Sequence, residues 1–506
     1  MRLADGLSHK QSGSSPLAQT NELLELAAGV IVTGFRGGLN AGVERALHRL
    51  PYAGYILFAE NVDGIASARE LTDALRAGVE PAPIVSIDQE GGRITRLRAG
   101  VENIPSMMAL GAAADEELAV SAGEQIAHDL RRAGCTLDFA PVLDLALDAR
   151  NTVIGTRAVG TSPALVTRIA GAFARGLERG GITPTFKHFP GHGATAFDTH
   201  LGAARLDSDE RTVRERDMVP FRECARDDVP IMAAHVAVPA LDGDRPATLS
   251  RVMLTGILRE QWHYGGLIFT DCMQMDAIAA SVGTVQGVTE AIAAGADCAL
   301  ISHDPDLAFE AATRLAEAVE AGRVPIARLR EAHARVMILR RRATAPLARN
   351  APAPHPDIGV RIARAAVTLV RGEARAAAAS GIAIVFGEAS LAAQAPALLE
   401  HRVGLDPTQS AREELLESLR AAQRRPIVLT YRAHLHPLQR QAIDAIVERS
   451  PDALVVSTGE PYDLPLFARA RHVAACYGND DVTLAGLADV VFAGVPGEGT
   501  LPVAID

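Results

Sequence analysis

Short apolar runs and amphipathic stretches alternate along the first two-thirds of the chain. Each run is nearly continuous in apolar residues, which is typical of a parallel strand buried on both faces. The stretches between the runs, such as 67–79 and 164–181, are rich in alanine, have helical periodicity and end near a glycine. The eight predicted strands fall within residues 29–35, 53–60, 82–90, 135–145, 183–189, 229–236, 266–272 and 298–304.

This repetition predicts the fold class of the first part of the chain. Eight strand–helix units in about 340 residues fit an α/β protein with an N-terminal TIM, or (β/α)8-type, barrel that carries insertions. A doubly wound sheet is the alternative, because the spacing of the runs does not show whether the sheet closes on itself.

A second, smaller domain is predicted to follow the barrel. Residues 343–358 are rich in proline, which fixes φ and removes backbone donors, so we expect a linker between domains at 1–342 and 359–506. Further apolar runs alternate with helical stretches beyond the linker, which predicts an αβα sandwich. These runs are 381–388, 426–432, 452–459, 472–478 and 489–495.

Composition excludes several classes of function. A formal charge of −11 and an aromatic content of 4% argue against a nucleic-acid binder, which would need a basic face or a stacking platform. No apolar run approaches 18 residues, so we expect no membrane partner. The five cysteines lie far apart and the polar N-terminus lacks the apolar core of a signal peptide, which together predict a cytoplasmic protein. The pattern predicts no particular oligomeric state.

Polar side chains gather where the predicted barrel strands end. Loops after the carboxyl ends of barrel strands form the active sites of such folds. Any one of these residues could simply cap a strand or a helix, but their shared position predicts one pocket lined with carboxylates and cations. They are Asp88, Glu90, Asp144, Lys187, His188, His235, Asp271, His303 and Asp304.

The densest group of such residues is KHFPGHGATAFDTH, residues 187–200. A metal site is one interpretation, since His188 and His192 are four apart, but the proline and glycines between and beside them disfavour a helix and no HExxH glutamate is present. A phosphate loop would need a Lys-Ser or Lys-Thr pair after its glycines, which is absent. A catalytic loop fits best, because Asp198 can accept the Nδ1 hydrogen of His200 and make it a general acid/base near neutral pH. We therefore predict no metal and no cofactor.

Four ordered motifs, and two in the second domain, resemble glycoside hydrolase family 3, specifically its β-N-acetylhexosaminidase branch. The stretch 187–200 resembles the family's KH(F)PGHG…DSH signature, with Thr199 in place of the usual serine. The other motifs are IDQEGGRITRL (87–97), NTVIGTRAVG (151–160), FTDCMQM (269–275), GEPYDL (459–464) and GTLPVAI (499–505). The resemblance thus covers nearly the whole chain, and Cys272 and Gln274 stand where the family varies.

The resemblance implies a role for each matched residue. Asp271 matches the nucleophile, His200 the general acid/base and Asp198 its partner. Glu90 is not among the sugar-binding residues, and we expect it to pair with a nearby arginine, while His192 is expected to shape the loop. The residues that match the sugar-binding set are Asp88, Arg96, Arg157, Lys187 and His188. From the residue types alone, Lys187 and Arg157 should also help to keep Asp271 ionised.

The activity that the resemblance implies is that of a retaining exo-β-N-acetylhexosaminidase, acting on a small carbohydrate such as a GlcNAc glycoside or a muropeptide in peptidoglycan recycling. A phosphorylase is an alternative, because a neutral histidine does not repel phosphate as a carboxylate would; a broad β-glucosidase/N-acetylglucosaminidase is another. A sugar-binding protein without activity is disfavoured, because binding alone needs no set such as Asp271, Asp198 and His200.

Overall fold

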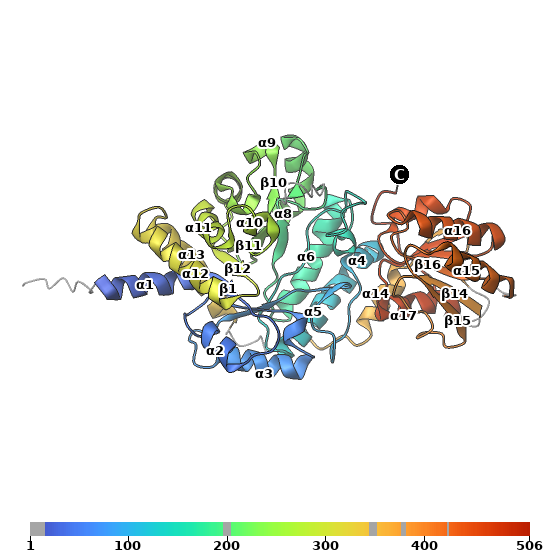
Figure 1. The fold of residues 1–506 in the computed structure, drawn as a ribbon, viewed down its shortest axis with the longest axis horizontal. Coiled ribbons are helices and arrows are strands. Elements are labelled where there is room, and N and C mark those ends of the chain that lie inside the picture. Colours follow the sequence, from blue (N-terminus) through green and yellow to red (C-terminus); the bar gives the residue numbers. More distant parts are fainter. Residues whose placement is uncertain (1–15, 196–203, 344–351, 376–380, 422–424, 506) are drawn as a thin grey trace, which may run out of the picture.

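The computed structural model describes residues 16–195, 204–343, 352–375, 381–421 and 425–505. These residues form two lobes, a large one that contains the first sheet and a smaller one that contains the second (Figure 1). Among them, no helix is both long and apolar enough to cross a bilayer.

Eight parallel strands form the sheet of the first lobe, in the order β6-β3-β2-β1-β12-β11-β9-β7. The two edges meet through parallel bridges from Leu137 to Thr183 and from Val142 to Lys187, so the sheet curls round as a barrel and not as a doubly wound sheet. Each strand lies within one of the eight predicted runs. The strands are β1 (Ile31–Thr33), β2 (Gly54–Leu57), β3 (Ile84–Ile87), β6 (Leu137–Asp138), β7 (Phe186–Phe189), β9 (Ile231–Ala233), β11 (Ile268–Cys272) and β12 (Cys298–Ile301).

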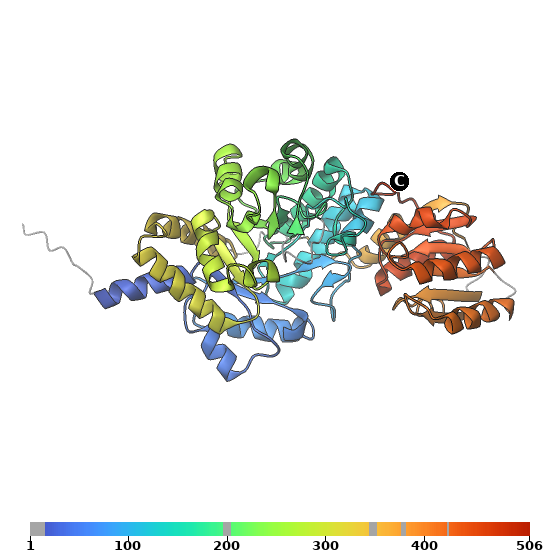
Figure 2. The ribbon, with the colours of Figure 1, turned by 45° about the horizontal axis from the view of Figure 1, so that its top comes forward.

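Helices surround this sheet (Figures 1 and 2). Side chains cap several of their N-termini, for instance those of Asp115, Ser162 and Asp304. The main ones are α1 (Pro16–Ala28), α2 (Ala41–Leu47), α3 (Ile65–Arg76), α5 (Glu116–Arg132), α6 (Pro163–Arg179), α8 (Val219–Cys224), α11 (Thr284–Ala294), α12 (Pro305–Glu320) and α13 (Ile326–Ala343).

The second lobe is an αβα sandwich, as predicted, with helices on both faces of a six-stranded sheet (Figure 2). The strand order is β13-β18-β17-β16-β14-β15, and only β13 runs antiparallel to its neighbour. The strands are β13 (Thr368–Arg371), β14 (Gly381–Phe386), β15 (Leu398–Val403), β16 (Ile427–Thr430), β17 (Leu454–Ser457) and β18 (His472–Ala475). The helices are α14 (Ile358–Ala366), α15 (Gln409–Ala421), α16 (Pro437–Arg449) and α17 (Asp481–Ala488).

One predicted strand of this lobe is wrong. Residues 489–493 are helical and continue α17 as a single π-helical stretch, with Val490 and Val491 buried in the core of the lobe. A short apolar run does not by itself distinguish a buried strand from a buried helix. The pattern also missed β13 and β15, the two edge strands, because polar residues interrupt their apolar positions.

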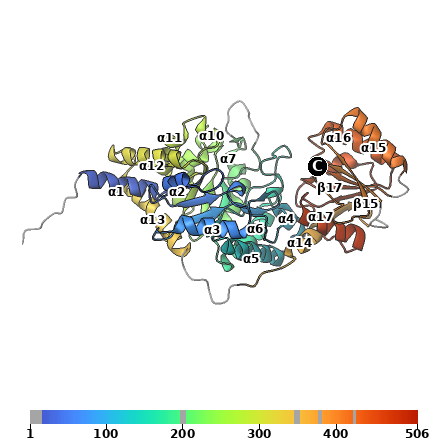
Figure 3. The ribbon, with the colours of Figure 1, turned by 60° about the horizontal axis from the view of Figure 1, so that its bottom comes forward.

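The two lobes are joined by ordered contacts. Helix α14 packs against α17 of its own lobe and against α4 (Met107–Ala113) and α5 of the barrel (Figure 3). The C-terminal segment folds back on the barrel, where Thr500 donates its N–H to the carbonyl of Ala112, and the carbonyl of Pro502 accepts from Thr161, both at 2.9 Å. The domain limits at 342 and 359 stay a prediction, since residues 344–351 lie outside the described part.

Candidate active site

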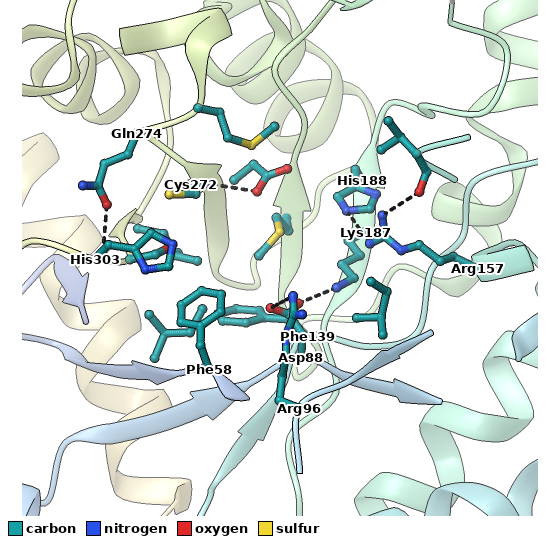
Figure 4. A pocket seen from close by; sticks show the side chains of 18 of the residues that line it. Phe58, Asp88, Arg96, Phe139, Arg157, Lys187, His188, Cys272, Gln274 and His303 are labelled. Atoms are coloured by element: carbon teal, nitrogen blue, oxygen red, sulfur yellow. Dashed lines mark hydrogen bonds and ion pairs between the residues drawn. The ribbon is translucent and has the colours of Figure 1, made fainter. Parts of the chain in front are cut away.

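A cavity of about 470 Å³ opens at the carboxyl ends of the barrel strands. Six of the eight residues predicted to form the site line it: Asp88, Arg96, Arg157, Lys187, His188 and Asp271. The other two, Asp198 and His200, belong to residues 196–203 and lie outside the described residues. Figure 4 shows Lys187, His188 and Arg157 on one side of the cavity, and Phe58 and His303 on the other.

Different barrel segments supply these side chains. Asp88 follows β3, and Arg96 follows a small hairpin of β4 (Gln89–Gly91) and β5 (Ile94–Thr95). Arg157 ends the short helix η2 (Gly155–Arg157) in the long connection after β6. Lys187 and His188 are adjacent in β7, and Asp271 is the fourth residue of β11.

Lys187 lies at the centre of a buried ionic network. Its Nζ lies 2.7 Å from Asp88 Oδ1 and 2.5 Å from Glu90 Oε1, and its side chain is 2% exposed. Arg157 donates from Nε and Nη2 to the two oxygens of Glu90, both at 2.8 Å. Burial opposes ionisation of Glu90, but the charges of Arg157 and Lys187 outweigh it and lower the pKa of this carboxyl. The predicted pairing of Glu90 with an arginine is confirmed.

The same network fixes Arg157 and reaches Arg96. Burial disfavours the charged form of Arg157, yet the Glu90 carboxylate more than offsets it and the pKa of the guanidinium is raised. Arg96 is held more loosely, with Nη2 3.9 Å from Asp88 Oδ2 and its guanidinium over the ring of Phe58. Arg96 and Asp88 therefore present polar atoms to the cavity on a partly exposed surface.

His188 is oriented by Asp144. The Nδ1 of His188 lies 2.6 Å from Asp144 Oδ2, and Asp144 Oδ1 accepts from the backbone N–H of His192 at 2.7 Å. Burial opposes ionisation of Asp144, but His188 and His192 outweigh it and lower its pKa. An ionised Asp144 requires hydrogen on Nδ1 of His188, which leaves Nε2 to accept from Arg157 Nη2 at 3.4 Å. This support for His188 was not predicted from sequence.

Asp271 is only partly buried and opens to the cavity. Its Oδ1 accepts the backbone N–H of Cys272 at 2.7 Å. Burial opposes ionisation, but His188, His235, that N–H and Lys187 together lower the pKa of Asp271. Lys187 thus contributes as predicted.

His235 supports the segment that carries Asp271. Its Nε2 lies 2.9 Å from the carbonyl oxygen of Cys272, and its Nδ1 lies 2.8 Å from the hydroxyl of Thr248. Burial lowers the pKa of His235, so the ring is neutral at pH 7 and Nε2–H donates to that carbonyl. At that pH, His235 carries no charge that could act on Asp271. The ionised form of Asp271 is then stabilised by the N–H of Cys272 and by Lys187.

The opposite wall of the cavity contains His303, which was expected there as a strand-end residue, together with residues that the sequence did not assign to the site. The rings of Phe58 and His303 lie 4.5 Å apart, and Gln274 accepts the backbone N–H of His303 at 2.9 Å. Arg36 and Met275 complete this wall. Arg36 directly follows the first predicted strand, so the rule that identified the other polar strand-end residues could have found it. Phe58 is apolar and gives no such signal.

The arrangement suits a polar, uncharged ligand with many hydroxyls. Four cationic side chains and Asp88 line the cavity and can donate to and accept from a sugar, while an ionised Asp271 can attack an electrophilic carbon above it. His192 also lines the cavity, although it was expected only to shape the loop. Within the described residues, no three His, Cys, Asp or Glu side chains are grouped so that they could hold a metal ion.

Known proteins are similar to this chain in sequence and in fold. The family model described as "Glycosyl hydrolase family 3 N terminal domain" matches residues 26–339. A β-hexosaminidase from Pseudomonas aeruginosa is 37% identical over 281 residues, 55% of this chain and 84% of that protein. A glycoside hydrolase family 3 β-N-acetylglucosaminidase from Paenibacillus sp. str. FPU-7 superposes with a TM-score of 0.87 at 29% identity, covering 96% of this chain and 99% of that chain.

A third relative has been solved with a sugar. NagZ from Neisseria gonorrhoeae, in complex with N-trifluoroacetyl-D-glucosamine, matches with a TM-score of 0.52 at 30% identity, over 63% of this chain and 98% of that chain. The family match spans more than half of the chain, and the Paenibacillus likeness extends over both lobes. The chain therefore belongs to glycoside hydrolase family 3, in its β-N-acetylhexosaminidase branch, and is a glycoside hydrolase.

Proposed function

We propose that the protein is a retaining exo-β-N-acetylhexosaminidase that removes terminal β-linked N-acetylglucosamine from the non-reducing end of a glycan. The observation that carries this proposal is Asp271, an ionised carboxylate open to a cavity whose other polar groups are suited to sugar hydroxyls. A carboxylate placed in this way can act as a nucleophile at C1.

In the first step, an Asp271 oxygen attacks C1 from below the sugar ring, and the bond from C1 to the leaving oxygen breaks. His200 donates a proton to that oxygen, while Asp198 accepts the Nδ1 hydrogen of His200 and stabilises the ring. The product of this step is an ester between C1 and Asp271, and the departing sugar leaves as an alcohol.

In the second step, His200 removes a proton from water, which attacks C1 and releases Asp271 as a carboxylate. Two inversions at C1 give net retention of configuration. The residues proposed to hold the sugar through both steps are Asp88, Arg96, Arg157, Lys187 and His188.

The substrate is proposed to be a small GlcNAc-containing carbohydrate, either a muropeptide or a chitobiose-like fragment. The N-acylated glucosamine in the Neisseria gonorrhoeae relative supports this class of ligand. A cytoplasmic location, and with it a role in peptidoglycan recycling, is proposed because all five cysteines are free thiols, which suits a reducing compartment.

One assay tests the proposal. Nitrophenyl β-N-acetylglucosaminide and nitrophenyl β-glucoside are compared as substrates, each with and without phosphate, and the sugar products are identified. Free N-acetylglucosamine in both buffers is expected. A sugar 1-phosphate would identify a phosphorylase instead, equal rates on both glycosides a broad glycosidase, and no turnover of either would contradict the proposal.

A further inference from the structure

The motif GEPYDL, residues 459–464, has no part in the proposed chemistry, yet it brings the second lobe against the turn that carries Arg157, one of the residues that line the cavity. Glu460 lies between β17 and the short helix η6 (Pro461–Phe467) and is 3% exposed. Its Oε1 accepts the backbone N–H of Thr156 at 3.3 Å. A carboxylate of the second lobe is thus buried against the barrel turn that ends at Arg157.

The charge of Glu460 is fixed within its own lobe. Arg432, which follows β16, donates from Nε and Nη2 to the two carboxylate oxygens, both at 2.7 Å. Burial opposes ionisation of Glu460, but the Arg432 guanidinium outweighs it and lowers the pKa of this carboxyl. The acceptor that faces Thr156 is therefore a charged oxygen in a set position.

The turn is shaped to receive this carboxylate. Gly155 has φ +45°, in the left-handed region that favours glycine. A Cβ at this position would lie 1.9 Å from Glu460 Oε1, closer than any side chain could come. The close approach of the two lobes at this point therefore depends on the absence of a side chain at 155.

The turn connects Glu460 to Arg157, and the residues just before the turn contact the segment around His192. Arg157, the residue after Thr156, binds Glu90 and reaches His188. Four residues before the turn, Asn151 donates from Nδ2 to the carbonyl of His192 at 2.8 Å. His192 lies in the segment that leads to residues 196–203. Displacement of this turn would move a sugar-binding group directly.

Arg93 of the barrel and two side chains of the second lobe, Tyr462 and His434, hold the connection after β6. Arg93 Nη2 donates to the carbonyls of residues 152–154 at 2.6–2.9 Å. Tyr462 donates its hydroxyl to the carbonyl of Ala146 at 2.6 Å, and His434 Nε2 lies 3.0 Å from the carbonyl oxygen of Ala149. Among these contacts, that of Glu460 reaches the backbone closest to Arg157, because Thr156 immediately precedes Arg157.

We propose that Glu460 is a positioning residue of the active site: it holds the 155–157 turn so that Arg157 stays against Glu90 and His188 with its remaining donors toward the sugar. The second lobe then contributes to the active site by holding Arg157 in position. This inference rests on the proposed role of Arg157 in sugar binding, but not on which sugar is cleaved.

The test compares Glu460→Gln with Glu400→Gln in the full-length chain. Glu400 is a matched control, because it is a low-exposure carboxylate of the same lobe that pairs with Arg402 and with no barrel residue among its described contacts. Each variant is assayed on the aryl glycoside that the wild type cleaves fastest, so that a wrong sugar assignment does not affect this test. Thermal unfolding is recorded alongside.

Glu460→Gln should lower kcat/KM by about 10- to 100-fold, the usual value of a hydrogen bond to a charged group, mainly through a higher KM. Glu400→Gln should stay within about twofold, although both variants lose an ion pair. Glu460→Asp keeps the charge for Arg432 and draws it away from Thr156, so it should fold and lie between the two. Equal kcat/KM for Glu460→Gln and Glu400→Gln would overturn the proposal.

A double-mutant cycle distinguishes positioning from general stability. If Glu460 acts through Arg157, then Glu460→Gln should change kcat/KM by less than about twofold in an Arg157→Ala background. Multiplicative losses would mean that Glu460 acts independently of Arg157, and would overturn the positioning role even if the single variant is impaired.

Discussion

Asp271 is a carboxylate kept ionised by its close neighbours. Burial normally favours the neutral acid, but here the N–H of Cys272 and the charge of Lys187 act on the carboxylate from fixed positions. No proton would have to leave Asp271 before the attack proposed for it. If Asp271 is the nucleophile, the pH dependence of the reaction should then reflect the proposed acid/base group.

The first prediction follows from that nucleophile. Incubation with 2-acetamido-2-deoxy-5-fluoro-glucosyl fluoride should add one fluorosugar mass to the peptide that contains Asp271, because the fluorine slows release of the ester. Mass spectrometry of the digested protein measures the adduct. A label on another residue, or an oxazoline product without any adduct, would contradict a covalent role for Asp271.

The second prediction concerns Glu90 and pH. The folded pKa of Glu90 is lowered, so its ionisation stabilises the fold above its unfolded pKa of about 4.3, and this stabilisation is lost as the pH falls toward the folded pKa. Glu90→Gln leaves Lys187 and Arg157 with less opposing charge, and should cost about 3–5 kcal/mol at pH 7. The difference from wild type should shrink as the pH falls below about 4.

Thermal or denaturant unfolding across this pH range measures the effect. Glu310→Gln is the control, since Glu310 is exposed and should change stability by about 0.5 kcal/mol or less at any pH. A constant difference between wild type and Glu90→Gln across the range would mean that Glu90 acts through packing and not through its charge.

The strands of the barrel were predictable because they are buried on both faces. The continuous apolar runs that follow from this burial include all eight strands, and the strand ends then locate the cavity. The edges of the second sheet were not predictable in this way. β15 carries the exposed Leu399 and the charged Arg402, so its residues do not form an apolar run, while the apolar 489–493 is a helix.

Most residues that line the cavity were predictable, and the pairs that support them were not, apart from the pairing of Glu90 with an arginine. Asp88, Lys187 and Asp271 are polar residues at strand ends, a signal visible in the sequence. The pairing of His188 with Asp144 joins residues that are 44 positions apart, and Thr156 meets Glu460 across 304 positions. No local pattern encodes such pairs, because they depend on how the connection after β6 folds over the barrel.

The third prediction belongs to the loop that begins at β7, and it rests on the sequence because Asp198 and His200 lie outside the described residues. General acid/base help is worth about 10²–10⁴-fold, and most where the leaving group is a poor one. His200→Ala should therefore nearly abolish cleavage of GlcNAc–sugar linkages, while aryl substrates keep a burst of phenol followed by slow turnover. Asp198→Ala should show a milder form of the same pattern.

Azide provides the discriminating measurement for this loop. It needs no proton removed, so it should intercept the glycosyl-enzyme and partly restore turnover in His200→Ala. Rates with and without azide, on leaving groups of different acidity, measure the effect. Equal losses for good and poor leaving groups, without rescue, would assign His200 to binding or to loop structure.

At the scale of the whole molecule, the second lobe is attached where the barrel is least regular. The connection after β6 is long and contains only the short helix η2. Its carbonyls at Ala146 and Ala149 are met by Tyr462 and His434 from the second lobe. The contacts from the second lobe add to the backbone hydrogen bonds that the connection makes itself. We therefore predict that loosening the lobe interface increases motion in the connection.

The last prediction tests this dependence with two matched variants, Tyr462→Phe and Tyr431→Phe. Both keep an aromatic ring on the second lobe, but only Tyr462 donates a hydroxyl to the barrel, to the carbonyl of Ala146. Tyr462→Phe should cost about 1 kcal/mol and should speed hydrogen–deuterium exchange in residues 146–157, whereas Tyr431→Phe should leave both unchanged. Exchange by mass spectrometry measures the local effect and calorimetry the global one. If Tyr462→Phe lowers stability while exchange in 146–157 stays at the wild-type rate, the order of that connection comes from the barrel alone.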